Sequence, residues 1–338
     1  MSRHPGLIVI LISIFLLLWI TGCVTMDKPK TTLKVIAAGS LLYPFAELEK
    51  EFELSHPDVD LQVEGHGSIQ VIRQVTDLGR SADIIAVADA SLIPDLMFVQ
   101  RKSGNGNYTD WYTPFAGNAM VLAYTNQSRY AWEITSDNWI AILQRPDIRI
   151  GISNPMLDAA GYRALMVILL EEKRSGDKGI FSVLIGNRTN PPLVVEVMDN
   201  RSRVVLPEML KPGTRTFAVR DGSIYLLSLL DAGGIDYAFE YRSVAQEHGL
   251  RWVELGPSVD LSDQNQAGNY RQVEVELGFQ RFSSIGTRRV GQPIAYAITI
   301  PNGAEQPELA HEFVDLVRIR FGEGKYGWPS PLHAGATA

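Results

Sequence analysis

The chain has 338 residues, of which 46% are hydrophobic and 20% are charged, and its formal net charge is −7. This composition excludes a disordered or collagen-like chain, and an acidic sequence without a basic block argues against a nucleic-acid partner. At this length we expect two domains, because single hydrophobic cores rarely grow beyond about 250–300 residues.

Residues 1–22 are predicted to be a secretory signal peptide. A basic residue, Arg3, precedes the uncharged apolar run from Leu7 to Ile20, and small residues follow. A membrane-spanning helix is the alternative, but the run is shorter than the roughly 20 residues that a span needs. The segment ITGC resembles a lipobox, in which the cysteine is lipidated and becomes the mature N-terminus. Since Cys23 is the only cysteine, we expect no disulfide and a lipid-anchored tether over residues 23–32.

From residue 33 the sequence alternates between strand and helix patterns, which predicts an α/β fold. The runs 33–38, 60–64 and 82–89 are typical of strands, and helical patterns begin near Ser40 and Ser68 between them. Such repeated units imply mixed, mostly parallel sheets that are flanked by helices.

A second set of units follows a loop rich in glycine and asparagine at 104–107. Residues 186–222 are polar and contain proline, which predicts loops and short strands. We expect further strands at 120–126, 148–155, 235–241 and 293–301, and helices that begin near residue 158 and span 223–232 and 303–321.

Two serines occupy equivalent positions in the first half of the chain. Ser40 and Ser68 each follow a glycine after a predicted strand and precede a predicted helix. A helix N-terminus presents unpaired N–H groups, and a serine hydroxyl can donate as well, so two such corners would form an anion pocket. The alternative is that both serines are ordinary helix N-caps.

Two carboxylates stand out in the second half. The stretch GIDYAFEY alternates like a half-buried strand, and it ends with Glu240, although glutamate is uncommon in strands. Asp158 is predicted to lie at the start of a helix, where an acidic residue also complements the helix dipole. His66 we interpret as a solvated loop residue.

Motifs of common enzymes are absent from the sequence, which contains no GxxxxGK[ST], GxSxG, HExxH or CxxC and no histidines at metal-ligand spacing. We therefore expect no cofactor and no catalytic turnover. A surface-anchored hydrolase with Asp158 and Glu240 as its acid and base remains an alternative from a different functional class.

Several segments resemble the tungstate/molybdate-binding proteins of archaeal ABC importers. They are VIAAGSLLYPF, VEGHGS, ADIIAVADASLIP, GISNPMLDAAGYRAL, LLSLLDAGGIDYAFEYRSVAQEHGLRWVELG and VGQPIAYAITIP, in the same order along the chain. The resemblance implies a two-lobed periplasmic-binding-protein fold of type II. It also implies that Ser40 and Ser68 donate hydrogen bonds to a tetrahedral oxyanion, and that Asp158 and Glu240 bind its metal directly.

The resemblance explains why two carboxylates would lie in a site that binds an anion. A carboxylate would repel a dianion that is only hydrogen-bonded, whereas a high-valent metal accepts hard oxygen ligands. The sequence departs from the family where Ala159 and Ala160 replace the usual Pro-Cys and where Ala90-Ser91 replaces an aromatic residue. It does not rank tungstate against molybdate.

We therefore expect a monomeric lipoprotein that faces the outside of the membrane and delivers molybdate or tungstate to an ABC permease. Lobe one is predicted at 33–117 plus 242–321 and lobe two at 118–241, followed by a poorly packed tail at 322–338. A sulfate or phosphate receptor of the same fold is the alternative. In that receptor the serines bind the anion and the carboxylates are structural groups or, for phosphate, protonated acceptors.

Overall fold

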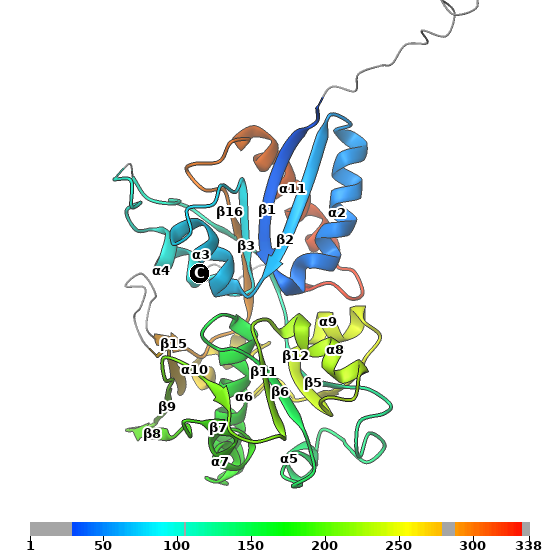
Figure 1. Ribbon diagram of the computed structural model, residues 1–338, viewed down its shortest axis with the longest axis vertical. Coiled ribbons are helices and arrows are strands. Elements are labelled where there is room, and N and C mark those ends of the chain that lie inside the picture. Colours follow the sequence, from blue (N-terminus) through cyan, green and yellow to red (C-terminus); the bar gives the residue numbers. More distant parts are fainter. Residues whose placement is uncertain (1–28, 105, 279–287, 333–338) are drawn as a thin grey trace, which may run out of the picture.

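The structure is a computed structural model that describes residues 29–104, 106–278 and 288–332. Over these residues the chain forms two α/β lobes, one above the other in Figure 1. The predicted signal peptide and Cys23 lie outside the described residues. Within the described ranges, no helix is both long enough and apolar enough to cross a bilayer.

The first lobe is built on a six-stranded mixed sheet in the order β17-β4-β16-β3-β1-β2. Strand β1 pairs in parallel with β2 and β3, whereas β16 is antiparallel to β3 and β4. The strands are β1 (Thr31–Ala38), β2 (Val59–His66), β3 (Ile84–Val87), β4 (Thr113–Gly117), β16 (Ala295–Thr299) and β17 (Ser330–Pro331).

The second lobe contains a five-stranded mixed sheet in the order β11-β6-β12-β5-β13, a four-stranded sheet in the order β15-β14-β9-β8 and the pair β10-β7. Its strands are β5 (Met120–Tyr124), β6 (Ile150–Ser153), β7 (Thr189–Asn190), β8 (Val195–Met198), β9 (Arg201–Val205), β10 (Lys211–Pro212), β11 (Phe217–Arg220), β12 (Tyr237–Tyr241), β13 (Arg251–Glu254), β14 (Val273–Glu276) and β15 (Arg288–Val290).

Helices flank the sheets in both lobes. They are α2 (Leu42–Ser55), α3 (Ser68–Thr76), α4 (Leu92–Met97), α5 (Trp139–Leu143), α6 (Ala159–Ser175), α7 (Ile180–Leu184), α8 (Leu227–Asp231), α9 (Arg242–Glu247), α10 (Ala267–Tyr270) and α11 (Pro307–Glu323). Short 3₁₀ helices span η1 (Gly39–Leu41), η2 (Gly186–Arg188), η3 (Ser223–Leu226) and η4 (Gln264–Gln266).

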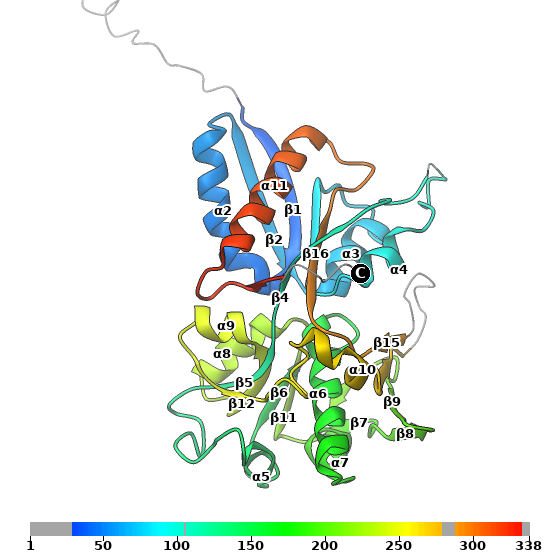
Figure 2. The same ribbon diagram turned by 180° about the vertical axis from the view of Figure 1, so that it is seen from behind.

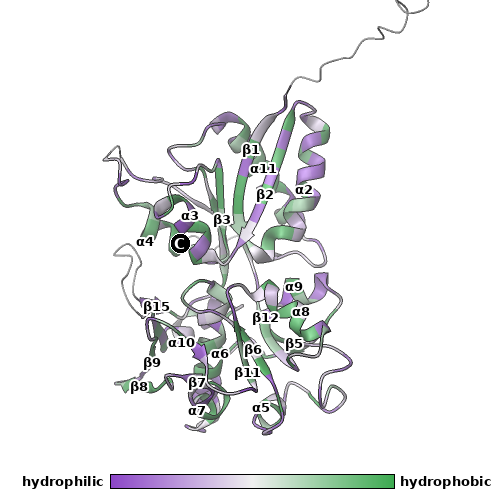
Figure 3. Cartoon of the chain, in the orientation of Figure 1, coloured by the Kyte–Doolittle hydropathy of each residue, from purple (hydrophilic) through white to green (hydrophobic). Residues whose placement is uncertain are grey.

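Apolar periodicity explains the long helices. On α2 the apolar residues Phe45, Leu48 and Phe52 are spaced to share one face, and they are buried. Phe45 packs edge-to-face on Phe313 of α11 at 5.7 Å between ring centroids. The two helices lie side by side against one face of the first sheet (Figure 2). Figure 3 shows hydrophobic residues concentrated in strands such as β1 and β3, whereas α2 alternates with hydrophilic residues.

The chain passes between the lobes where β4 of the first sheet leads directly into β5 of the second. Asn118 lies in this crossing, and its side-chain amide donates to Ser243 Oγ at 2.9 Å and to Tyr296 Oη at 3.1 Å. The return crossing comes just before β16. This differs from our expected boundary at Arg242, because β13 pairs with β5 and keeps the chain in the second sheet.

Two further expectations differ from the structure. The segment after residue 322 is not loose throughout, because Trp328 packs on Phe321 at 4.8 Å and β17 pairs with β4. Strand β12 is buried along its whole length instead of on one face. The reason is that helices α6, α8 and α9 all contact this strand.

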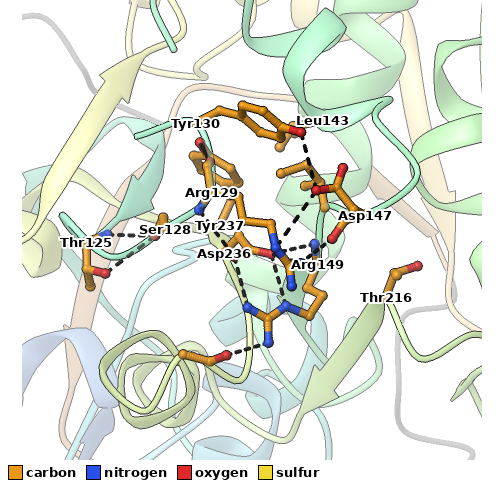
Figure 4. A network of polar contacts seen from close by, with 12 residues as sticks. Thr125, Ser128, Arg129, Tyr130, Leu143, Asp147, Arg149, Thr216, Asp236 and Tyr237 are labelled. Atoms are coloured by element: carbon orange, nitrogen blue, oxygen red, sulfur yellow. Dashed lines mark hydrogen bonds and ion pairs between the residues drawn. The ribbon is translucent and has the colours of Figure 1, made fainter. Parts of the chain in front are cut away.

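A buried ion-pair network fixes the chain just before β12 (Figure 4). Asp236 is 1% exposed, and its carboxylate accepts hydrogen bonds from the backbone and side chain of Arg149 and from Arg129. Charged, multiply bonded contacts of this kind are strong and directional. They hold the strand that carries Glu240 at its other end.

Candidate functional site

Ser40 lies in the 3₁₀ turn η1, at the carboxyl end of β1. Its hydroxyl is hydrogen-bonded to Tyr296 Oη at 2.9 Å, and the residue is 5% exposed. The turn has no side-chain cap. The hydroxyl is therefore not an N-cap, and its remaining hydrogen-bonding capacity is available beside a cavity.

Ser68 is the first residue of α3 and is fully buried. The N-cap of this helix is Gly67, whose backbone N–H donates to the side-chain oxygen of Gln70 at 3.3 Å. The Ser68 hydroxyl instead accepts a 3.0 Å hydrogen bond from the backbone N–H of Ala88. Because an accepting hydroxyl still carries its own proton, Ser68 can donate to a further partner.

The N-terminus of α3 is less open to an anion than the sequence suggested. The backbone N–H groups of Ile69 and Gln70 donate to the carbonyl of Leu157 in the other lobe, at 3.1 and 3.2 Å. Gly67 permits this approach, since a Cβ there would lie 2.5 Å from the Leu157 oxygen and 2.8 Å from Asp158 Cβ. The first turn of α3 therefore serves mainly as a contact between the lobes.

Asp158 is the N-cap of α6 and is 5% exposed. Its Oδ2 accepts a 3.0 Å hydrogen bond from the backbone N–H of Ser223. Burial raises the pKa of this carboxyl above its ordinary value, although the Ser153 hydroxyl and the backbone N–H groups of Ser223, Ser68 and Ala160 act to lower it. One carboxylate thus faces elements of both lobes.

Glu240 is completely buried near the end of β12. Its Oε1 accepts a 2.8 Å hydrogen bond from the backbone N–H of Tyr241, and its Oε2 has no hydrogen-bond partner among the described residues. Burial raises the pKa of this carboxyl to about 8; the charge of nearby Asp158 raises it further, whereas the Tyr241 backbone and the Ser223 hydroxyl lower it. A buried carboxyl with one unused oxygen is a costly arrangement in the absence of a partner.

A small cavity joins these groups. Ser40 and Asp158 line it directly, whereas Ser68 and Glu240 do not line it but lie beside Asp158. The full lining is Gly39, Ser40, His66, Asp158, Gly222, Ser223, Ile224, Tyr225 and Tyr241. The four predicted residues are therefore gathered at one place between the lobes.

Three lining residues were missed or misjudged from the sequence. Ser223 bonds Asp158 and faces Glu240, and Tyr241 contributes its ring beside them. The signal for Ser223 was visible, because Gly222-Ser223 repeats the glycine-serine pair found at Ser40 and Ser68. His66 is not a solvated loop residue: it ends β2, lines the cavity and contacts Glu64 at 2.6 Å.

The site offers hydroxyl and backbone donors beside two carboxylates, which suits an oxyanion whose central atom accepts oxygen ligands. No group of three or more His, Cys, Asp or Glu side chains could hold a metal ion within the described ranges. Asp158 and Glu240 therefore do not belong to a site in which three or more such side chains bind a metal ion.

Most of the chain is similar to known proteins. The family described as bacterial extracellular solute-binding protein matches residues 33–320. A protein named molybdate/tungstate-binding protein WtpA from Pyrococcus abyssi is 36% identical over 319 residues, which are 92% of this chain and 87% of that protein. An uncharacterized solute-binding protein from Methanoculleus marisnigri is 40% identical over 285 residues, 84% of this chain and 77% of that protein.

Solved structures agree on the fold. The periplasmic binding protein AfuA from Actinobacillus pleuropneumoniae superposes with a TM-score of 0.51 at 14% identity, over 91% of this chain and 86% of that one. The substrate-binding protein of an ABC transporter from Agrobacterium tumefaciens gives the same TM-score and identity over 92% and 83%. The predicted two-lobed periplasmic-binding-protein fold is confirmed.

Proposed function

Because this chain belongs to the bacterial extracellular solute-binding protein family, we propose that it captures molybdate or tungstate outside the cytoplasm and delivers the oxyanion to an ABC permease. Members of the family bind solutes and are not enzymes, which removes the hydrolase alternative. The 36% identity to a molybdate/tungstate-binding protein over most of both chains supports the choice of ligand.

One observation carries the proposal: Asp158 lines the same cavity as Ser40, and the buried carboxyl of Glu240 and the backbone of Ser68 lie beside Asp158. An oxyanion that is only hydrogen-bonded would be repelled by ionised carboxylates in a site shielded from water. Molybdenum and tungsten in their high oxidation states can accept hard oxygen ligands in addition to their four oxo groups. The free Oε2 of Glu240 is suited to that role.

Binding would draw the lobes together around the ligand. Ser40 and Ser68 come from the first lobe, and Asp158 and Glu240 come from the second. A ligand that needs both sets binds the closed arrangement better than the open one, and such differential affinity drives closure.

Calorimetric titration of the purified chain with tungstate, molybdate, sulfate and phosphate tests the proposal. We expect tight binding of tungstate and molybdate and at least about 100-fold weaker binding of the other two, comparable with the loss of one buried charged contact. Equal affinity for sulfate would contradict the proposal.

A phosphate-type receptor is the second candidate, and the raised pKa of Glu240 favours it. A carboxyl with a pKa of about 8 is mostly protonated at pH 7 and can donate a hydrogen bond to an anion. The two candidates differ in proton balance. Coordination of a metal requires the ionised carboxylate, so tungstate binding at pH 7 should release about one proton, whereas hydrogen bonding to phosphate should release none. Titrations in buffers of different ionisation enthalpy measure this number.

A further inference from the structure

Two consecutive residues of α6 reach from the second lobe to the first. The hydroxyl of Tyr162 donates to Asp89 Oδ2 at 2.5 Å. The guanidinium of Arg163 donates through Nη1 to the carbonyl of Ala88 at 2.7 Å, and its Nη2 lies 3.7 Å from Asp89 Oδ2. None of these four residues is more than 3% exposed. The contacts join different lobes, so they exist only while the lobes are together.

The same arginine touches the candidate ligand site from behind. Arg163 Nη1 also donates to Tyr241 Oη at 2.7 Å, and Tyr241 lines the cavity. The peptide of Ala88, which receives Arg163 on its carbonyl, donates its N–H to Ser68 Oγ. One guanidinium therefore links a cavity residue of the second lobe to a candidate oxyanion donor of the first.

Asp89 is a suitable partner for this arginine. Burial acts to raise the pKa of its carboxyl, but the charges of Arg163 and Arg289 and the hydrogen bonds from Tyr162 and Ser91 hold that pKa below its ordinary value. Asp89 thus remains ionised although it is buried. Separating a buried charge pair of this kind mainly accelerates dissociation, because the pair forms after the partners have met.

We propose that Asp89, Tyr162 and Arg163 form a latch that holds the two lobes closed over the bound oxyanion and that Arg163 is a positioning residue, which places Tyr241 against the ligand. The proposal rests on the proposed binding function, since it assigns to these residues control over how long that ligand stays. α6 then carries a candidate ligand, Asp158, at its N-cap and the latch one turn further on. Ligand contact and lobe closure are coupled through a single rigid helix.

Rapid-dilution kinetics with radiolabelled molybdate test the latch. Arg163→Met should release the ligand roughly 10- to 100-fold faster than the wild type, with the association rate changed less than about threefold. Tyr162→Phe keeps the ring and removes only the donor to Asp89, so it should give a smaller acceleration in the same direction. Arg174→Met is the matched control, because Arg174 lies on the same helix and pairs within it with Glu171.

Two further measurements guard against a trivial loss of structure. Thermal melting must show that Tyr162→Phe folds, and the combined variant Tyr162→Phe/Arg163→Met should release ligand at least as fast as Arg163→Met alone, since each change removes a different contact with Asp89. Wild-type release rates in both Arg163→Met and Tyr162→Phe would overturn the latch and leave the proposed function intact.

A wild type that does not retain molybdate would overturn the proposed function instead. In that case, small-angle X-ray scattering of the ligand-free wild type and variants tests the latch. A larger radius of gyration in Arg163→Met than in the wild type and Arg174→Met supports the latch, and equal radii contradict it.

Discussion

The backbone N–H of Ser223 donates a 3.0 Å hydrogen bond to the carboxylate of Asp158. The hydroxyl of the same serine lies at Glu240 and lowers the pKa of that carboxyl. One residue therefore stands between two buried acids that are far apart in the sequence. This arrangement joins the two acids through one residue, which suits two ligands of one central atom.

Replacing either carboxylate should change selectivity more than stability. Glu240→Gln and Asp158→Asn keep the size of the side chain but remove the charge that a high-valent metal favours. We expect the affinity for tungstate and molybdate to fall by at least about 100-fold, as for loss of a buried charged contact. Sulfate binding should stay unchanged or improve, because a repulsive charge has gone.

The control for this experiment is Glu274→Gln, which changes another buried glutamate, on β14 of the four-stranded sheet. Its oxyanion affinities should equal those of the wild type. Calorimetric titration measures all three variants, and an equal loss of tungstate and sulfate binding in Glu240→Gln would show that the carboxylate has no special role.

The two serines should contribute as hydrogen-bond donors. Ser40→Ala and Ser68→Ala are each expected to weaken tungstate binding by about 1–3 kcal/mol, the usual value for a hydrogen bond to a charged group. Ser128→Ala is the control, since Ser128 is also buried but bonds the backbone of Thr125 within the second lobe. Normal binding by both site variants would place the oxyanion elsewhere.

The stability of the ligand-free protein should depend on pH through Glu240. The pKa of this carboxyl is raised from 4.5 to about 8 in the folded chain. Between these two values the folded state holds a proton that the unfolded state has released, so the free energy of unfolding falls as pH rises from about 5 to 8. Glu247, whose pKa is raised to about 7, contributes in the same direction.

Glu240→Gln isolates the first contribution, because glutamine resembles the protonated acid. The variant should lose less stability than the wild type between pH 5 and pH 8 and should melt at a higher temperature at pH 8. Melting curves at several pH values measure the difference, and parallel losses in both proteins would mean that Glu240 does not titrate in this range.

The anchor is predicted from the sequence alone. If the segment ITGC is a lipobox, the mature chain starts at a lipid-modified Cys23, and Cys23→Ser yields unprocessed or released protein. Mass spectrometry of the native protein reads the N-terminus directly. An intact segment from Met1 to Gly22 would contradict the lipoprotein prediction.

The spacing of apolar residues along the sequence predicted several of the helices and strands. The strand before Ser40, helix α2 with its buried Phe45 face and helix α6 all follow from apolar periodicity. Leu78 continues the apolar spacing of Ile72 and Val75, but it is 68% exposed because helix α3 ends at Thr76. Strand β13 was missed, and with it the lobe boundary, since a short strand on a sheet edge carries little periodic signal.

The residues of the candidate site could be proposed from the sequence, but their assembly could not. Ser40, Ser68, Asp158 and Glu240 were predicted from strand ends, glycine neighbours and a family resemblance, and their role in binding stays a prediction. The contacts of Arg163 with Asp89 and Tyr241 could not be found in this way, because they join three distant segments through tertiary packing. Ser223 could have been predicted, because it follows a glycine as Ser40 and Ser68 do. It was missed because it lies at the edge of a segment that was interpreted as loops.

X-ray absorption spectroscopy of the tungstate complex tests the role of the carboxylates most directly, since it counts the oxygen neighbours of the metal. The account predicts six neighbours in the wild type, four oxo groups and one oxygen each from Asp158 and Glu240, and a lower number in Glu240→Gln. Four oxygen neighbours at tetrahedral distances in the wild type would contradict it and would leave a receptor that binds its oxyanion through hydrogen bonds alone.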